Sequence, residues 1–444
     1  MKKFFETLRN IWKIEELRAR ILYTLGILLV YRLGTHVVIP GIDPTRLGNL
    51  QQPSGNIMDI INLFTGGAFA RASIFGLGIM PYISATIVIQ LLGIAVPYFQ
   101  RLQREGESGR RKINQISRYL TLGILLLQAP TYITSLRYQL PPDAFSPNFS
   151  IIGAVIILTA GTMFIMWLGE RITDKGIGNG ISLIIMIGII ARLPQSIGLE
   201  FASRLDQQGG GLVAFLVEIL IMFVVFMLSI LLVQGTRRIP VQYAKRIVGN
   251  KQYGGVRQYI PLKVNAAGVM PIIFAQALMF IPITIAGFAK SDSATGIAAT
   301  FSNPTGFWYN FVNATLIILF TYFYTAVTVN PTQMAEDMKK NGGFIPGVKP
   351  GRKTAEFLDS VMSKITLPGS FFLAFVAIMP AFAMMFGIDQ SFAMFFGGTS
   401  LLIMVGVILD TLQQVESHLL MRHYDGLMKS GKIKGRAGGT ASGI

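Results

Sequence analysis

The sequence predicts an all-α polytopic membrane protein with ten transmembrane helices. Its 444 residues are 52% hydrophobic and only 14% charged, whereas an ordinary soluble domain carries roughly 25% charged residues. The mean hydropathy is +0.53. Ten apolar stretches approach the length of about 20 residues that a helix needs to cross a bilayer. The net charge of +17 could suggest nucleic acid, but such binding needs a charged soluble surface that this chain lacks. We therefore expect no direct DNA binding.

The predicted spans follow one another along the whole chain. The stretch at 177–193 is the shortest of them and begins among glycines. We do not expect the first span to be a signal peptide, because no small-residue cleavage site follows it and another span does. The ten stretches are 21–39, 74–96, 119–136, 151–169, 177–193, 212–234, 266–288, 308–329, 367–387 and 391–413.

The basic residues are distributed unequally between the two sides of these spans. Thirty-two of the 39 Lys and Arg residues fall on the side that holds the N-terminal segment 1–20 and the tail 414–444. Basic loops are retained in the cytoplasm. The sequence therefore predicts that both termini are cytoplasmic.

Two loops on the basic side are longer than topology requires. Segments 235–265 and 330–366 contain Gly-Asn, Gly-Gly and Pro-Gly turn signals rather than low-complexity sequence. Ordered loops of this length are usually functional. We interpret them as protruding hairpins that bind an acidic cytoplasmic partner. The alternative is that these charges only set the orientation of the spans in the membrane, and that the turns are simply exposed to solvent.

Signals for catalysis or metal binding are weak. The chain has no cysteine, and its three histidines (His36, His418 and His423) are scattered, so no metal site or cofactor is expected. The segment 426–432 has the glycine spacing of a phosphate-binding loop, but Ile433 replaces the required Ser or Thr. No nucleophile motif or pair of carboxylates is apparent, and we predict that the protein is not an enzyme.

Few charges lie within the predicted spans. Glu218 and Asp410 lie near span ends, where their side chains can reach the interface. Arg32 lies deeper in its span and should face protein or water. A ladder of proton-relay carboxylates, typical of pumps, is missing.

The segment 55–73 combines a short apolar helix candidate with Gly66-Gly67. It is too short to cross a bilayer. Irregular backbone at membrane depth is tolerated only inside protein or beside a water-filled cavity. The segment is therefore either an amphipathic helix on the surface or a re-entrant element in a cavity.

Nine short sequence strings occur along the chain in a characteristic order and spacing. The strings are IPGID at 39–43, ASIF at 72–75, IMPYIS at 79–84, EGESGRRK at 105–112, GERIT at 169–173, GIGNGIS at 176–182, YAKR at 243–246, PLKVN at 261–265 and GGTSLLI at 397–403. Together they resemble the bacterial SecY family of protein translocation channels. The resemblance covers essentially the whole chain, and no single string carries it alone.

The resemblance implies two inverted, pseudo-symmetric halves of five spans each, 21–193 and 212–413, with a hinge loop at 194–211. It also implies that segment 55–72 is a short re-entrant plug helix. The plug residues would include Met58, Ile61, Phe64, Gly66 and Gly67.

The same resemblance implies a pore ring of aliphatic side chains and a lateral gate toward lipid. A hydrophobic constriction blocks ions when no chain occupies it. From sequence alone the isoleucines would be packing or lipid-facing residues, and the polar residues generic contacts between helices. The ring would consist of Ile79, Ile83, Ile181, Ile185, Ile273 and Ile403, and the gate would carry Ser84, Gln128 and Asn265.

The basic loops would then bind the ribosome and the SecA motor ATPase. The family usually has arginine where this chain has Lys349, and lysine lacks the bidentate guanidinium. Small membrane subunits resembling SecE and SecG are further expected partners, together with a secretory precursor and membrane lipid. The expected binding residues are Lys245, Arg246, Lys251, Arg257, Lys349 and Arg352.

The resemblance therefore predicts a gated protein-conducting channel in the bacterial cytoplasmic membrane. It would translocate unfolded secretory polypeptides and release transmembrane segments laterally into lipid. The alternative is an ion-coupled secondary transporter of small solutes, which is also built from inverted repeats and broken helices. The scarcity of intramembrane acids and the long basic loops disfavour this alternative.

Overall fold

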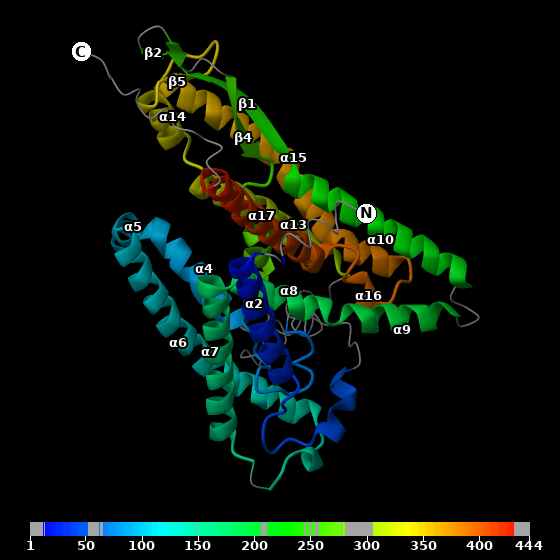
Figure 1. The fold of residues 1–444 in the computed structure, drawn as a ribbon. Coiled ribbons are helices and arrows are strands. Elements are labelled where there is room, and N and C mark those ends of the chain that lie inside the picture. Colours follow the sequence, from blue (N-terminus) through cyan, green and yellow to red (C-terminus); the bar gives the residue numbers. More distant parts are fainter. Residues whose placement is uncertain are drawn as a thin grey trace.

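The structure is a computed structural model, in which the helices form two groups joined by a central pair (Figure 1). It describes residues 12, 14–51, 62, 65–147, 149–205, 211–243, 246–248, 251–253, 257–276, 278–279 and 305–429. One group contains the helices of residues 15–175, and the other contains the helices of residues 211–429. The two helices of residues 180–205 run between these groups.

The first half of the chain contains helices and short 3-10 turns. The elements are α2 (Glu15–Gly34), η1 (Pro44–Gln51), α4 (Met80–Ala95), α5 (Pro97–Arg104), α6 (Glu107–Gln139), η2 (Pro142–Ala144), α7 (Ile151–Lys175), α8 (Gly180–Ile190) and α9 (Leu193–Leu205).

The second half adds two small sheets to its helices. The elements are α10 (Gly211–Gln234), β1 (Thr236–Tyr243), β2 (Arg246–Val248), β3 (Lys251–Tyr253), β4 (Arg257–Lys263), α13 (Phe307–Thr328), α14 (Pro331–Lys340), β5 (Gly343–Phe344), α15 (Arg352–Met385), α16 (Gln390–Ala393) and α17 (Gly398–Lys429).

Seven helices of the described chain are long and apolar enough to cross a membrane, and a bent helix pair raises this number to eight. The bent pair is α4 with α5, which turn by 101° relative to each other. Pro97 causes this break, because it lacks an N–H group and disfavours helical backbone at Val96 before it. The expected stretch 74–96 therefore becomes helix only from Met80.

Most of the other predicted spans coincide with helices. Stretches 119–136, 151–169, 212–234, 308–329 and 367–387 correspond to α6, α7, α10, α13 and α15. Helix α2 begins and ends earlier than the predicted 21–39. Part of the stretch 266–288 lies outside the described residues, although 270–276 are helical.

Two predicted boundaries are wrong. Most of the expected hinge loop 194–211 is helix α9, whose apolar face packs on α10 and α16. The expected tail from residue 414 begins as a continuation of α17, which extends to Lys429. The α9 sequence forms its own helix two residues after α8 ends, whereas the helix-forming sequence after residue 413 continues α17.

The two long basic loops fold into one small unit beside the ends of α14 and α15 (Figure 1). Strand β1 pairs antiparallel with β4 from Thr236↔Lys263 to Gln242↔Arg257 and with β5 at Tyr243↔Gly343, so the sheet order is β4-β1-β5. A separate apolar core lies beneath the sheet. The first loop therefore forms a hairpin as predicted. The second loop does not: it forms helix α14 and the short strand β5, which joins the sheet of the first loop.

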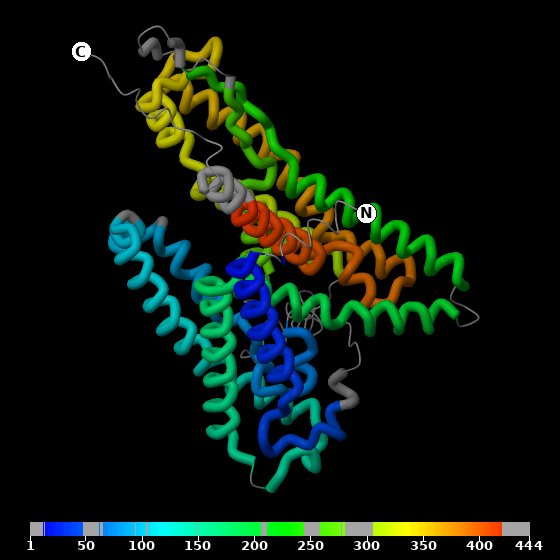
Figure 2. The backbone as a smooth tube through the Cα atoms, viewed as in Figure 1, coloured from blue at the N-terminus to red at the C-terminus, as the bar shows by residue number. Residues whose placement is uncertain are grey.

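The tube view follows the same two groups of helices along the chain (Figure 2). The largest hydrophobic cluster joins these groups, because it contains buried residues of α2, α4, α7 and α8 together with residues of α10, α13, α15 and α17. A second cluster lies within the first group alone. The core that both groups share is therefore the place to examine for a functional site.

Candidate functional site

The six predicted pore-ring isoleucines lie in or against the hydrophobic cluster that joins the two groups. They come from α4 and the residue before it, from α8, from the helical segment 270–276, and from α17. None of these side chains carries charge, and together they form an aliphatic contact between the two groups of helices. Ile79, Ile83, Ile185 and Ile403 are buried members of the cluster, and Ile181 and Ile273 are partly buried against it.

Next to this cluster, residues 65–79 form a buried series of turns that precedes α4. Asn62 caps this segment: its carbonyl oxygen accepts from the Gly67 N–H at 2.8 Å, and its side-chain oxygen accepts from the Ala70 N–H at 3.1 Å. Asn62 is 3% exposed. The described part of the segment therefore lies inside the protein and not on its surface.

The Gly66-Gly67 turn requires glycine. Both residues have positive φ, +64° and +89°, a conformation that side chains disfavour. A Cβ atom at Gly66 would also lie 2.9 Å from the Cα atom of Gly188 in α8. Of the predicted plug residues, Gly66 and Gly67 occupy this turn. Met58, Ile61 and Phe64 lie outside the described residues.

Three arginines and a histidine surround this turn. Arg32 donates from Nη1 to the carbonyl oxygen of Gly66 at 2.9 Å, and Arg71 lies 3.2 Å from the His36 ring. A Cβ at Gly67 would lie 3.5 Å from Arg192 and from Arg71. Arg32 therefore faces protein, one of the two alternatives, protein or water, that the sequence predicted for a charge at this depth.

The predicted gate residues come from both groups of helices, but the described contacts do not join them to one another. Ser84 in α4 and Gln128 in α6 are partly buried. Asn265 is 5% exposed and donates from Nδ2 to Gly268 of its own turn at 3.0 Å. Its Oδ1 atom is buried without a hydrogen-bond partner in the described structure.

A polar contact that the sequence analysis missed links the two groups. The hydroxyl of Tyr324 in α13 donates to Oε1 of Gln90 in α4 at 3.4 Å. The Tyr324 ring also meets that of Phe274 edge to face, at a centroid distance of 5.4 Å. The available signal was a glutamine in an otherwise apolar span, but sequence alone cannot supply its partner 234 residues away.

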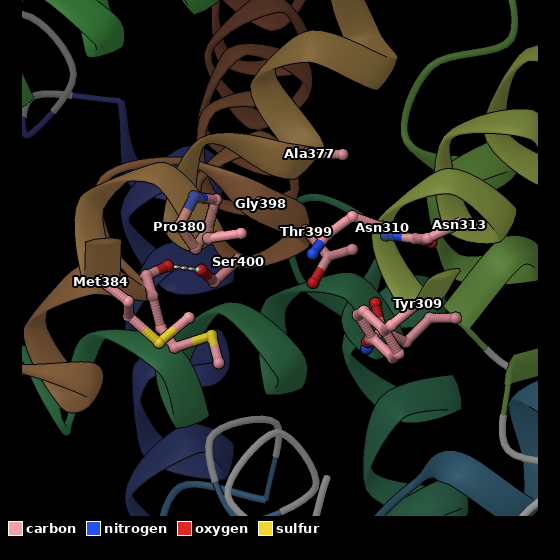
Figure 3. A pocket seen from close by; sticks show the side chains of 12 residues that line it. Tyr309, Asn310, Asn313, Ala377, Pro380, Met384, Gly398, Thr399 and Ser400 are labelled. Carbon is pink, nitrogen blue, oxygen red and sulfur yellow. Dashed lines mark hydrogen bonds between the residues drawn. The ribbon is translucent and has the colours of Figure 1, made fainter. Parts of the chain in front are cut away.

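A small pocket of about 40 Å³ lies within the second group, between α13, α15 and α17 (Figure 3). Tyr309, Asn313 and Ser400 contribute polar atoms to its wall, and Ser400 donates to the carbonyl of Met394. The Oδ1 atom of Asn313 is buried and has no hydrogen-bond partner in the described structure. Among the described residues, no group of three or more His, Asp or Glu side chains could hold a metal ion.

The predicted binding residues lie on the unit formed by the two long loops. Lys349 and Arg352 are exposed, and Arg352 pairs with Glu356 at 3.2 Å. Gly347 and Gly351 on either side of Lys349 have positive φ, +83° and +96°, so the two Pro-Gly turns fix its position. Arg246, Lys251 and Arg257 lie in β2, β3 and β4, whereas Lys245 lies outside the described residues.

The expectation that Glu218 reaches the interface is wrong. Glu218 is buried, and its Oε1 atom lies 2.6 Å from Nη2 of Arg204 in α9. Arg204 also contacts Glu200 at 2.7 Å. The sequence could not indicate this burial, because it results from α9 packing on α10 where a loop was expected.

One exposed carboxylate lies in the segment that follows α2. The backbone N–H and the hydroxyl of Thr45 donate to Asp43 Oδ1 at 2.9 and 2.7 Å, and these hydrogen bonds hold the pKa of Asp43 below its ordinary value. Asp43 thereby stabilises the first turn of η1 in its ionised form.

Comparisons with known proteins agree with this architecture. The family model described as SecY matches residues 73–412. The protein translocase subunit SecY of Streptomyces coelicolor is 43% identical over 435 residues, which cover 94% of this chain and 98% of that protein.

Two solved structures have similar folds. One concerns the plug domain of a SecY protein and its role in the closed translocation channel; it aligns with a TM-score of 0.58 at 19% identity, covering 90% of this chain and 92% of the other. The second is Sec61 in a canine ribosome-channel complex from the endoplasmic reticulum, with a TM-score of 0.57, 17% identity and the same coverage.

Proposed function

The chain belongs to the SecY family, and from this we propose that it is a gated protein-conducting channel. It passes unfolded secretory polypeptides across the membrane and releases transmembrane segments sideways into lipid. The observation that carries the proposal is the aliphatic cluster that joins the two groups of helices. Uncharged isoleucines from at least four helical segments converge there, and they can separate around a passing chain.

The cluster also explains how such a pore stays closed to ions. An aliphatic constriction dewets when it is empty, and an ion cannot shed its water there at an acceptable free energy. Branched side chains without charge can then seal around an extended polypeptide. The buried turn at Gly66-Gly67 supports a second barrier, in which segment 55–72 is the plug.

The lateral gate is proposed at the contact between α4 and α13. Ser84, Gln128 and Asn265 are its predicted polar residues, and the hydrogen bond between Gln90 and Tyr324 adds a weak link across the same contact. An apolar signal sequence can replace such a link with buried apolar surface. This exchange favours opening for apolar segments over polar ones.

The basic loop unit is proposed as the binding surface for cytoplasmic partners. Its exposed Lys349 and Arg352 attract acidic proteins and phosphate groups. The ribosome and a SecA-like motor ATPase fit that chemistry, and SecE-like and SecG-like subunits would flank the helices. We place the protein in the bacterial cytoplasmic membrane with both termini inside, because 32 of the 39 basic residues share one side.

The channel itself needs no catalytic group, and the energy comes from a bound partner or a membrane potential. The alternative of an ion-coupled solute transporter finds no support in the described spans. Such transporters carry acids beside a substrate site, whereas Glu200 and Glu218 are buried against Arg204.

Reconstitution tests the proposal. The chain is placed in vesicles with SecE-like and SecG-like subunits and a SecA-like ATPase, and a secretory precursor is added with ATP. We expect ATP-dependent protection of the precursor from external protease, and none in vesicles without the chain. Saturable uptake of a small solute, without any precursor protection, would contradict the proposal.

A further inference from the structure

The start of α8 is held by side chains of three other helices. The Ile177 N–H donates to Oγ1 of Thr24 in α2 at 3.1 Å. The Gly180 N–H donates to Oγ1 of Thr173 in α7 at 2.9 Å. Both acceptors belong to the first group of helices, so these two hydrogen bonds attach the start of α8 to that group.

The third hydrogen bond joins this start to the second group. The Gly178 N–H donates to Oε1 of Gln414 in α17 at 2.9 Å, between residues that are 236 positions apart. Gly178 is buried, and a buried N–H that loses its acceptor costs more free energy than an exposed one, which water can satisfy. Gln414 therefore supplies an acceptor that the backbone at Gly178 needs.

The loop that contains Gly178 lies directly on α17. Gly178 has a φ of +83°, and a Cβ atom there would lie 3.0 Å from Oγ1 of Thr411. Thr411 donates to the Val407 carbonyl at 2.7 Å, so its hydroxyl is held on the helix. Because glycine has no side chain, the loop backbone can approach the face of α17 that carries Thr411 and Gln414.

This loop is also tied closely to the first turn of α8. Asn179, the residue after Gly178, accepts at Oδ1 from the N–H groups of Ile181 and Ser182 at 3.1 and 3.3 Å. These hydrogen bonds form an N-terminal cap, which fixes the loop backbone relative to the helix. A displacement of Gly178 from α17 therefore also displaces Ile181, one of the predicted pore-ring isoleucines.

The face of α17 that carries Gln414 also reaches the pore ring. Ile403 and Gln414 are 11 residues apart, which is about three turns of 3.6 residues, so both side chains lie on one side of the helix. Ile403 and Ile185 are buried in the cluster that joins both groups, and Ile181 packs against it. Helices α8 and α17 therefore meet both in this cluster and at the hydrogen bond of Gly178 with Gln414.

We propose that Gln414 is a positioning residue for the pore ring. By accepting from the Gly178 N–H, it holds the start of α8 on α17, and the alignment of Ile181 and Ile185 with Ile403 depends on this attachment. The inference rests on the proposed function, because the alignment matters only where these isoleucines seal a channel.

The neighbouring glutamine in α17 provides a matched control. Oε1 of Gln413 accepts from Nζ of Lys263, at the end of β4, at 3.5 Å. This contact lies within the second group and does not involve α8. Gln413 and Gln414 are both exposed residues of one helix, so the same substitution at either position makes a similar change to the side chain.

Three variants of the full chain test the proposal, each reconstituted with the same small partner subunits as in the translocation test. Gln414→Met conserves the length and the helix propensity of the side chain but removes the acceptor. Gln414→Glu keeps an acceptor oxygen at the same position. Gln413→Met is the control.

Two quantities are measured in the idle channel: the amide hydrogen exchange of segment 176–182 and the ion conductance of the vesicles. We expect exchange in Gln414→Met to be about tenfold faster than in the parent chain, because losing the acceptor of a buried N–H shifts the local opening equilibrium by that order. We also expect its ion leak, normalised to the amount of folded channel, to rise. Gln414→Glu and Gln413→Met should match the parent in both quantities.

Unchanged exchange in Gln414→Met would show that Gln414 does not hold the loop, and faster exchange with an unchanged leak would show that the hydrogen bond does not position the ring. Either result overturns the inference, and so does a leak in Gln414→Glu equal to that in Gln414→Met. Protection of a secretory precursor is measured in the same vesicles. Failure of the proposed function then appears as missing protection in the parent chain, whereas failure of this inference appears only in the variants.

Discussion

Of the six predicted pore-ring isoleucines, Ile403 is the least exposed, at 0%, and it lies in α17 within the hydrophobic cluster that joins both groups. Replacing it by Asn buries an amide in an apolar contact, at a cost of about 1–3 kcal/mol when no hydrogen bond compensates. We expect Ile403→Asn to increase ion leak through the idle channel, measured as vesicle conductance. Ile403→Leu conserves volume and should leave the leak unchanged. Equal leak in both variants would contradict the role of Ile403 in the seal.

Gly66 has a backbone conformation and a close neighbour that both limit substitution. Alanine there must adopt a positive φ and approach Gly188 too closely, which costs roughly 1–3 kcal/mol. We expect Gly66→Ala to lower the thermal midpoint and to raise the resting leak. The control is Gly26→Ala in α2, where no atom lies within 4 Å of the new Cβ. A Gly66→Ala variant with the leak and midpoint of this control would refute the account of the turn.

At the residue scale, the sequence predicted which side chains are polar, charged or aliphatic, but not which residues they contact in the fold. The isoleucines were indistinguishable from packing residues until the family resemblance singled them out. Glu218 was misinterpreted because its helix was considered alone, whereas its partner Arg204 comes from α9. The Gln90–Tyr324 contact was missed for the same reason. Long-range pairs such as these depend on the whole fold.

Helix α13 contacts α4 across the two groups through the Tyr324 hydroxyl. A neutral hydrogen bond of this kind contributes about 0.5–1.5 kcal/mol. We expect Tyr324→Phe to ease opening, so that precursors with weakened signal sequences are translocated faster. Gln90→Leu should have the same direction of effect. Because the two residues form one link, the double variant should add little to either single variant.

Additive effects of the two substitutions would contradict that link. Phe323→Leu is a suitable control, because Phe323 precedes Tyr324 in the sequence. The Phe323 ring contacts Phe320 and donates no hydrogen bond. It should leave the translocation of weak signal sequences unchanged.

At the element scale, hydropathy predicted the long spans well and the interrupted ones poorly. Helices α7, α10 and α13 each contain a long, mostly apolar stretch and lie where expected. The break at Pro97 and the helical α9 were missed, because a window average does not register a single proline or a short amphipathic helix. The pairing of β5 with β1 was also missed, since two residues give no strand signal.

At the scale of the whole molecule, 32 of the 39 basic residues are predicted to lie on one side of the membrane, and this accounts for the net charge of +17. The resemblance to a known family supplied the two-halved architecture, which composition alone could not. The structure adds that the two long basic loops share one sheet. A partner that binds one of these loops therefore also affects the position of the other loop, because the two loops share a sheet.

The exposed tip of that unit should bind partners through charge. We expect Lys349→Ala/Arg352→Ala to weaken ribosome binding to the reconstituted channel, and the loss to shrink as salt screens the contact. Lys349→Arg should bind at least as tightly as the parent chain, because arginine adds a bidentate contact. Lys340→Ala, a basic residue at the end of α14, is the control. If the control and the double variant lost ribosome affinity equally, binding would depend on the overall positive charge of the unit and not on a specific docking site.

The central claim is that a polypeptide passes through the isoleucine cluster. The most direct test is disulfide cross-linking of an arrested precursor, carrying one cysteine in its translocating segment, to single cysteines placed in this cysteine-free chain. Cross-linking is expected at Ile403→Cys and Ile83→Cys and absent at Leu127→Cys, which is 72% exposed on α6. Cross-linking at Leu127→Cys, without any at the two isoleucine positions, would contradict the account.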